Sequence, residues 1–251
     1  MRGTPPEIIT MTIDQREIQF LEGRQSRFRE FYFTLKVMWE FVKGFRTLHF
    51  VGPCVTIFGS ARLKENTPEY QQTCEMAGRI AELGFTIMTG GGPGIMEAAN
   101  RGAKAVGGRS VGVNIELPFE QTPNPYMDRS VDIRYFFVRK VLLLKYSYGF
   151  VIMPGGFGTL DEFFETITLI QTEKISQFPI VVMDREYHQE LMRYVDKMIE
   201  RGTVSPSDKE LFFYTDSIDE AVKYLHENTI DEFQLTVEKK RWKPFGWLFE
   251  K

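Results

Sequence analysis

The chain has 251 residues, of which 43% are hydrophobic and 26% charged, and its formal net charge is −3. This composition is typical of globular domains and excludes disordered and collagen-like classes. The slight acidic excess, 34 Asp and Glu against 31 Lys and Arg, predicts no nucleic-acid partner, because such a protein would show clustered positive charge. Neither of the two cysteines belongs to a Cys-x-x-Cys pair, so a disulfide framework and structural zinc are not expected.

The first residues, MRGTPPEIITMTIDQ, lack the basic and then apolar run of a secretory signal. Charges interrupt every long apolar stretch, as Lys145 does within VLLLKYSYGF. We therefore expect a cytoplasmic protein with no membrane partner.

An aromatic and charged segment from about Ile18 to Leu48 predicts a helix. Its apolar residues recur at spacings of three and four and so share one helix face. They are Phe28, Phe31, Leu35, Met38, Val42 and Phe45. We expect this face to pack on the main domain or on a sister subunit. A membrane-surface helix is the alternative, because basic residues outnumber acidic ones here.

Beyond Val51 the chain alternates short apolar runs, glycine turns and helical stretches. The expected strands cover residues 54–58, 85–88, 110–115, 131–136, 149–153 and 179–183. The expected helices cover 69–83, 95–106, a stretch through 139–145, a stretch ending near 171, 186–200 and 218–226. This alternation predicts a Rossmann-like, doubly wound α/β fold, with helices on both faces of a parallel sheet. We divide the chain into an N-terminal helical extension (1–50), a Rossmann-like nucleotide-binding domain (51–230) and a C-terminal tail (231–251).

Three of the predicted strand-to-helix turns are FGSAR (58–62), TGGGPGIMEAAN (89–100) and PGGFGTLDEFFE (154–165). In such sheets the ligand lies beyond the carboxyl ends of the strands, where helix N-termini and backbone N–H groups attract anions. Glycine lacks the Cβ atom that would keep a phosphate away from the backbone. We therefore expect the three turns to converge at one site, and the simplest ligand is a phosphorylated molecule.

Several phosphate-binding classes are excluded by what the turns lack. The first turn, Gly59-Ser60-Ala61-Arg62, is not the Gly-x-Gly-x-x-Gly of a dinucleotide site, and neither glycine-dense turn carries a P-loop lysine. The three histidines have no metal-ligand spacing. We expect no NAD or FAD, no P-loop ATP hydrolysis, no metal and no other cofactor.

The segment PGGFGTLDE (154–162) resembles the PGGxGTxxE signature of the LOG (Lonely Guy) family of nucleoside 5′-monophosphate phosphoribohydrolases. The pair Arg139-Lys140 is similar to the Arg-Lys pair of that family, and GGGPGIM (90–96) to its GGGxxGxM turn. The resemblance spans about residues 54–225. The long N-terminal helix and the LPFEQTPNPY loop depart from the short plant-type form. Members are often labelled lysine decarboxylases, but no histidine here precedes the lysine that a pyridoxal site would use.

The resemblance implies hydrolysis of the N-glycosidic bond between a base and ribose 5-phosphate. Glu162 would be the catalytic carboxylate, stabilising an oxocarbenium-like sugar and orienting or deprotonating water. Arg139, the second catalytic residue, would contact the departing base, the ribose or Glu162. The substrate-binding residues would be Gly155, Gly156, Gly158 and Thr159 for the 5′-phosphate with Phe157 beside them, Lys140 and Asp161 for the phosphate and ribose hydroxyls, and Gly91, Gly92 and Met96 for the ribose or base, with Gly94 in the same turn.

Structural alternatives exist for these residues. Thr159-Leu160-Asp161-Glu162 is also a Ser/Thr-x-x-Glu capping box, in which Glu162 would only bind the N-cap amide. Arg139 and Lys140 could form a solvated patch, and Met96 could belong to the core.

Three functions follow from these observations. We favour an enzyme acting on AMP or an N6-modified, cytokinin-type AMP and forming a homodimer or larger homo-oligomer. A non-catalytic nucleotide or cofactor carrier on the same fold is the second hypothesis. An assembly module built on the N-terminal helix is the third.

Overall fold

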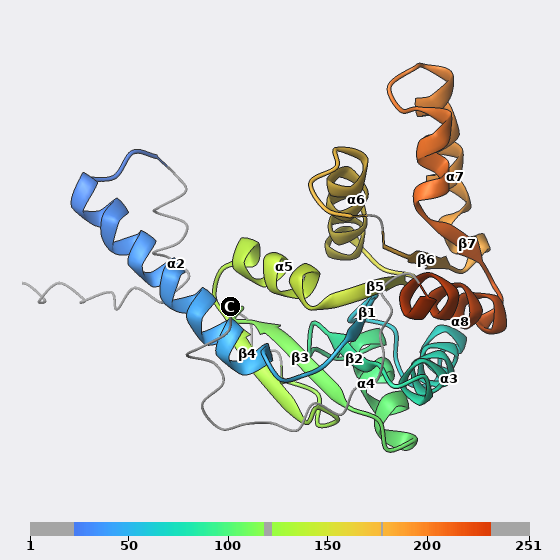
Figure 1. Cartoon of the computed structure of the whole chain (residues 1–251), viewed down its shortest axis with the longest axis horizontal. Coiled ribbons are helices and arrows are strands. Elements are labelled where there is room, and N and C mark those ends of the chain that lie inside the picture. The colour runs from blue at the N-terminus through green and yellow to red at the C-terminus, as the bar shows by residue number, and fades with distance from the viewer. Residues whose placement is uncertain (1–22, 118–121, 177, 232–251) are drawn as a thin grey trace, which may run out of the picture.

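The computed structural model of the chain describes residues 23–117, 122–176 and 178–231. Its centre is a sheet of seven parallel strands in the order β4-β3-β2-β1-β5-β6-β7 (Figure 1). The strands are β1 (Cys54–Phe58), β2 (Thr86–Thr89), β3 (Ser110–Ile115), β4 (Arg129–Ile133), β5 (Ser147–Ile152), β6 (Ile180–Met183) and β7 (Phe213–Thr215). Strands β1, β2 and β6 are buried along their whole length, and β5 is buried over its last four residues, so their sequences are rich in apolar residues.

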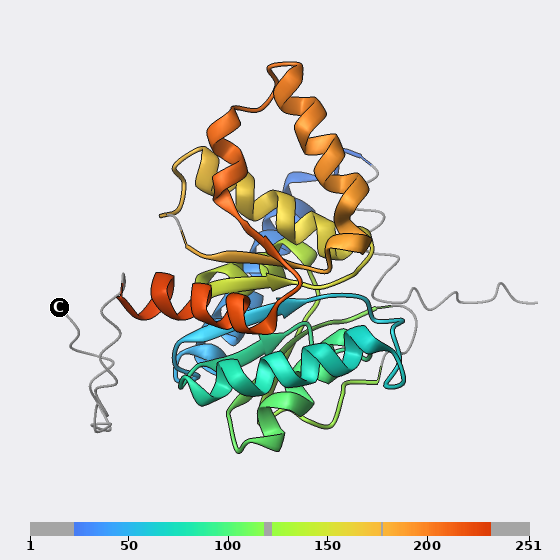
Figure 2. The ribbon, with the colours of Figure 1, turned by 90° about the vertical axis from the view of Figure 1, so that its right-hand side faces the viewer.

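Helices cover both faces of the sheet, so the predicted doubly wound α/β fold is confirmed. On one face lie α3 (Pro68–Glu82), α4 (Ile95–Ala105) and α8 (Ile218–His226), which share a core with β1 and β2. On the other lie α5 (Phe136–Lys145), α6 (Phe157–Gln171) and α7 (Arg185–Glu200), whose core includes Leu142, Phe163 and Met192. Figure 2 shows α3 and α8 on the side of the sheet opposite α6 and α7.

Most predicted elements agree with the structure to within a few residues, and four differences stand out. Strand β4 ends at Ile133 rather than at residue 136, because α5 already begins at Phe136. The edge strand β7 was not predicted, nor were the 3₁₀ helix η1 (Pro206–Leu211) and the π-helical turn η2 (Glu227–Asp231). A strand of three residues is too short to show a periodic pattern.

The strand order places a topological switch point between β1 and β5. From β1 the chain builds the sheet outward to β4, and it then returns to the other side of β1 with β5. At such a point the connections on the two sides lead away from each other, which leaves room for a ligand beyond the carboxyl ends. The predicted glycine turns follow β2, β1 and β5, which are neighbours in the sheet.

The N-terminal helix α2 (Arg27–Leu48) packs through a face other than the predicted one. Phe33, Val37 and Phe41 are partly buried against the core, and Leu48 is fully buried. Gly44 lies where a Cβ would meet the side chain of Leu142, so α2 approaches α5 closely. Glu40 accepts a hydrogen bond from the Arg134 backbone N–H at 3.0 Å and ties the helix to the end of β4.

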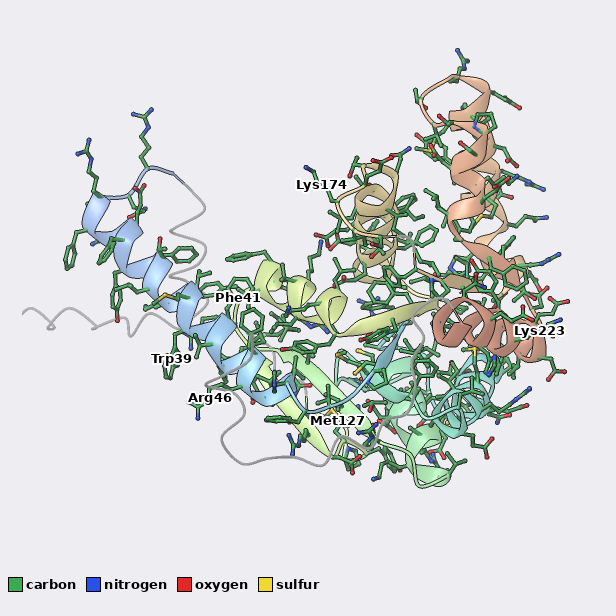
Figure 3. The ribbon with its side chains drawn as sticks, in the orientation of Figure 1. Trp39, Phe41, Arg46, Met127, Lys174 and Lys223 are labelled. Atoms are coloured by element: carbon green, nitrogen blue, oxygen red, sulfur yellow. The ribbon has the colours of Figure 1, made fainter. Side chains whose placement is uncertain are left out.

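The face that the sequence marked for burial is instead exposed on the single chain. All six of its apolar residues are exposed, from Phe45 at 37% to Phe28 at 79%. Trp39 points away from the domain (Figure 3) and is 63% exposed. Within the described part of the chain, no helix combines the length and hydrophobicity that a bilayer crossing requires.

Candidate active site

The three predicted turns meet at the carboxyl edge of β2, β1 and β5. Ser60, in the turn after β1, joins the other two. Its backbone N–H donates to the Pro154 carbonyl at 2.9 Å, and its carbonyl accepts from the Ile95 N–H at 2.9 Å. The convergence expected from the sequence is therefore confirmed.

The turn of residues 154–159, which we call the open turn, leaves backbone N–H groups unused. Helix α6 begins at Phe157 with Gly156 as its N-cap, and no side chain caps it. The backbone N–H groups of Gly156, Phe157 and Gly158 have no hydrogen-bond acceptor among the described residues. A Cβ built on Gly156 or Gly158 would meet no described atom within 4 Å beyond the adjacent residues and the backbone of α6 itself. Uncapped N–H groups at a helix N-terminus bind anions well.

Glu162 lies in the second turn of α6 and is only 7% exposed. No hydrogen bond to its carboxyl group occurs within the described segments. Burial raises the pKa of Glu162 to about 7, although the charges of Arg139 and Lys140 act in the opposite direction. Near neutral pH the group therefore exists in both protonation states, as a catalytic acid or base requires.

The structure contradicts the capping-box alternative for Glu162. A capping box needs Thr159 at the N-cap, but the N-cap is Gly156 and Thr159 lies three residues inside the helix. Glu162 is thus too far along α6 to reach the N-cap amide in that motif. Thr159 itself is 7% exposed and packs against Gly155.

Arg139 reaches from α5 to the ends of β2 and β3. Its Nε donates to the Val113 carbonyl at 2.8 Å and its Nη2 to the Gly90 carbonyl at 3.4 Å. Burial lowers its pKa, and the charge of Glu162 opposes that shift. A guanidinium has five N–H donors, so three have no partner among the described residues. Arg139 can therefore hold the protein backbone and still bind a ligand.

Lys140 is bound to two carboxylates rather than left free for a ligand. Its Nζ lies 2.9 Å from Asp161 and 2.8 Å from Glu165, both on α6. Burial lowers the pKa of Lys140, but hydrogen bonds to these carboxylates outweigh it and the net shift is upward. The structure thus brings the predicted pair Lys140 and Asp161 together as a link between α5 and α6. It also removes the solvated-patch interpretation of Arg139 and Lys140.

The turn of residues 89–94, which we call the packed turn, is filled by protein atoms. Gly90, Gly91, Gly92 and Gly94 are all buried. A Cβ on Gly90 would meet the Arg139 guanidinium and the Met96 sulfur, and one on Gly91 would meet the Asn114 amide oxygen. Glycine is needed here for close packing, and the partly buried Met96 contributes to that packing.

A buried polar network beneath the packed turn was not predicted. The Asn124 side chain donates to the Gly92 carbonyl and to Asn100, at 3.0 Å each, and its backbone N–H donates to Gly91. Asn100 bonds to Thr89 at 2.7 Å. The segment LPFEQTPNPY was expected to be a surface loop, but its Asn124 is only 5% exposed. Residues 118–121 of that loop lie outside the described residues.

The described residues include no group of three or more His, Cys, Asp or Glu that could hold a metal ion. Of the three histidines, His188 is buried at the start of α7, where its Nδ1 lies 2.9 Å from the Met183 carbonyl.

A model of the family described as possible lysine decarboxylases matches residues 96–225, which is more than half of the chain. The chain belongs to this family. It is the LOG family that the three motifs indicated, and its relatives carry the name of a phosphoribohydrolase.

Two curated relatives illustrate the similarity. The cytokinin riboside 5′-monophosphate phosphoribohydrolase LOG1 of Arabidopsis thaliana is 34% identical over 105 residues, which are 41% of this chain and about half, 48%, of that protein. The Mycobacterium tuberculosis protein named cytokinin riboside 5′-monophosphate phosphoribohydrolase is 31% identical over 155 residues, which are 59% of this chain and 81% of that one.

Solved structures show the same fold. The molybdenum cofactor binding protein of the phototrophic bacterium Rippkaea orientalis superimposes with a TM-score of 0.53 at 19% identity, over 74% of this chain and 99% of that one. At this identity the similarity concerns the fold alone.

Proposed function

We propose that this chain hydrolyses the N-glycosidic bond of a nucleoside 5′-monophosphate and releases the free base and ribose 5-phosphate. The observation that carries the proposal is the position of Glu162. A buried carboxyl group with its pKa raised to about 7 follows, on the same helix, an N-terminus whose N–H groups are unused. The names of the curated relatives support the same reaction.

In the proposed mechanism the open turn binds the 5′-phosphate and so fixes the sugar. The N–H groups of Gly156, Phe157 and Gly158 donate to the phosphate, which the positive end of the α6 dipole also stabilises. This anchor holds the anomeric carbon beside Glu162, and positioning of this kind contributes to the rate.

Glu162 then acts on the bond itself. As the bond between the anomeric carbon and the base nitrogen breaks, positive charge develops on the sugar, and the Glu162 carboxylate stabilises it. A water molecule attacks the anomeric carbon and gives one proton to Glu162, while the base leaves with the electron pair of the broken bond. The base takes up one proton from solvent water and Glu162 returns its proton to solvent, so that one water molecule is consumed in each turnover. In the proposed mechanism the remaining N–H groups of Arg139 bind the ribose or the departing base.

AMP or an N6-modified AMP is the substrate that we propose. The relatives are named for a cytokinin riboside 5′-monophosphate, which motivates testing both.

The test incubates the purified full chain with a panel of nucleoside 5′-monophosphates and N6-isopentenyl-AMP, and measures released base and ribose 5-phosphate by separate assays. Release of both products in equal amounts from one substrate, lost in Glu162→Gln, supports the proposal. Binding of AMP without release of base would instead identify a nucleotide-binding protein.

We also propose that the chain forms a homo-oligomer through the exposed face of α2. This face exposes Phe31, Leu35 and Met38, and water is a poor environment for so many neighbouring apolar side chains. Sedimentation should show a dimer or larger assembly at micromolar concentration, and Leu35→Glu should reduce its mass. A monomeric wild-type chain would contradict this proposal.

A further inference from the structure

We propose that Tyr187 is a positioning residue, whose hydroxyl fixes the peptide plane that aims the Gly156 N–H at the 5′-phosphate. The inference deepens the proposed function and rests on it. Tyr187 lies on α7, 32 residues after Gly155 of the open turn, and belongs to none of the three family motifs.

The Tyr187 hydroxyl donates a hydrogen bond of 2.7 Å to the Gly155 carbonyl. That carbonyl and the Gly156 N–H belong to one peptide unit. The unit is planar and trans, so its N–H points opposite to its C=O. Because the Tyr187 hydroxyl holds the Gly155 carbonyl toward α7, the Gly156 N–H points away from α7 and the peptide unit is kept from flipping.

The peptide units on either side are fixed in the same way. The Pro154 carbonyl accepts from the Ser60 N–H, and the Gly156 carbonyl accepts from the N–H groups at the start of α6. Their partner N–H groups belong to Gly155 and Phe157, for which no acceptor exists among the described residues. Three consecutive carbonyls are thus held by the protein while their N–H groups remain available. Only the middle one depends on a side chain.

Thr159 lies beside the same carbonyl. A threonine inside a helix commonly donates to the carbonyl four residues earlier, which here is the carbonyl of Gly155. The Thr159 hydroxyl makes neither this hydrogen bond nor any other within the described segments, and the bond that Gly155 accepts comes from Tyr187. In the proposal the Thr159 hydroxyl donates to the phosphate beside the Gly156 N–H.

Tyr187 is itself held in place by a strained junction between β6 and α7. Asp184 is not glycine yet adopts φ of +72°, which costs free energy. In this conformation its carboxylate caps α7 and accepts from the Tyr187 N–H at 2.9 Å. Strain of this kind persists where the surrounding structure fixes the backbone, and here it sets the position from which Tyr187 reaches the open turn.

The test is Tyr187→Phe, which removes the hydroxyl and keeps the ring. The matched control is Tyr194→Phe, two turns further along the same helix and similarly exposed, whose hydroxyl makes no hydrogen bond within the described residues. Both variants and the wild type are assayed with AMP and with adenosine, which differ only in the 5′-phosphate. The 5′-phosphate lies away from the bond that breaks, so we expect its loosened binding to act mainly on KM and only slightly on kcat.

For Tyr187→Phe we expect KM for AMP to rise about fivefold, the value of one hydrogen bond. We expect kcat to change by less than about twofold, because the reacting atoms keep their contacts. The kcat/KM for adenosine and all values for Tyr194→Phe should stay at the wild-type level. An unchanged KM for AMP would overturn the inference. An equal loss of kcat/KM with AMP and with adenosine would also overturn it, because a general structural defect affects both substrates alike.

Failure of the proposed function is recognised separately. If the wild type releases no base from any substrate, the reaction is wrong. The affinity for ribose 5-phosphate, measured by calorimetry, then decides the role of Tyr187. Binding about fivefold weaker in Tyr187→Phe than in the wild type supports the inference. Equal binding, or no binding by the wild type, overturns it.

Discussion

Two turns of this molecule look alike in sequence and differ in structure. The packed turn, TGGGPG, and the open turn, PGGFGT, both follow a buried strand and precede a helix. In the packed turn the glycines approach Arg139 and Asn114 so closely that a Cβ would collide with them. In the open turn a Cβ on Gly156 or Gly158 would meet no described atom within 4 Å beyond the adjacent residues and the α6 backbone, and no side chain caps α6 at its start.

The difference shows that dense glycine can serve two purposes. In one turn it lets protein pack on protein, and in the other it leaves the backbone accessible to a ligand. Glu162 follows the open turn on the same helix, whereas Arg139 donates into the packed turn. We therefore infer that the packed turn supports the site and that the open turn binds the phosphate.

Replacing Glu162, which lies on the helix that follows the open turn, should have the largest effect on activity. We expect Glu162→Gln to lower base release at least ~100-fold, as for loss of a general base. Wild-type activity should fall as pH drops below about 7, because protonation removes the carboxylate. The control is Glu190→Gln, which changes an exposed residue and should behave like the wild type. If Glu162→Gln is as active as this control, Glu162 has no catalytic role.

The same variant should be more stable than the wild type at pH 8. The folded-state pKa of Glu162 lies above its unfolded value, so its ionisation in the folded protein costs stability as pH rises from about 4.5 to 7. Glutamine avoids that cost, and we expect a gain of roughly 1–3 kcal/mol above pH 7 that vanishes below about pH 4.5. Denaturant unfolding at both pH values measures it, and a loss of stability at pH 8 would contradict the pKa shift.

The substitution Gly91→Ala tests the close packing of the packed turn, and the quantity to measure is the free energy of unfolding. Gly91 has φ of +73°, and a methyl group would meet the Asn114 side chain. We expect a loss of roughly 2–4 kcal/mol from backbone strain and overpacking together. Chemical denaturation measures the change. A variant as stable as the wild type would show that this turn has free space.

Gly158→Ala is the matched change in the open turn and should have the smallest effect on stability. Gly158 lies in the first turn of α6 and its methyl group would meet no described atom, so we expect stability to rise by up to about 0.5–1 kcal/mol. The methyl group would stand beside the phosphate, and we expect KM for AMP to rise about tenfold, or ~1.4 kcal/mol. If KM is unchanged, the phosphate does not bind here.

The sheet and the meeting of the three turns could be predicted because they follow from local patterns. Alternating buried runs and helices leave few topologies, and a parallel sheet brings all carboxyl ends to one edge. The start of α6 could not be fixed in this way. Gly156 rather than Thr159 proved to be the N-cap, since Thr-x-x-Glu occurs within helices as well as at their ends.

What the sequence did not reveal are contacts between distant segments. Helix α2 has two apolar faces, and periodicity alone cannot tell which of them packs on the domain. The bonds of Tyr187 to Gly155 and of Asn124 to Gly92 join residues 32 positions apart, and neither residue belongs to a recognisable motif. The roles of these residues can be recognised only once the fold has brought the distant segments together.

A crystal structure of Glu162→Gln with ribose 5-phosphate would test the assignment of the two turns most directly. We predict the phosphate at the open turn, within hydrogen-bond distance of the Gly156 and Phe157 N–H groups, with the anomeric carbon facing residue 162. A phosphate bound at the packed turn, or an open turn without phosphate at saturating ligand, would contradict the assignment.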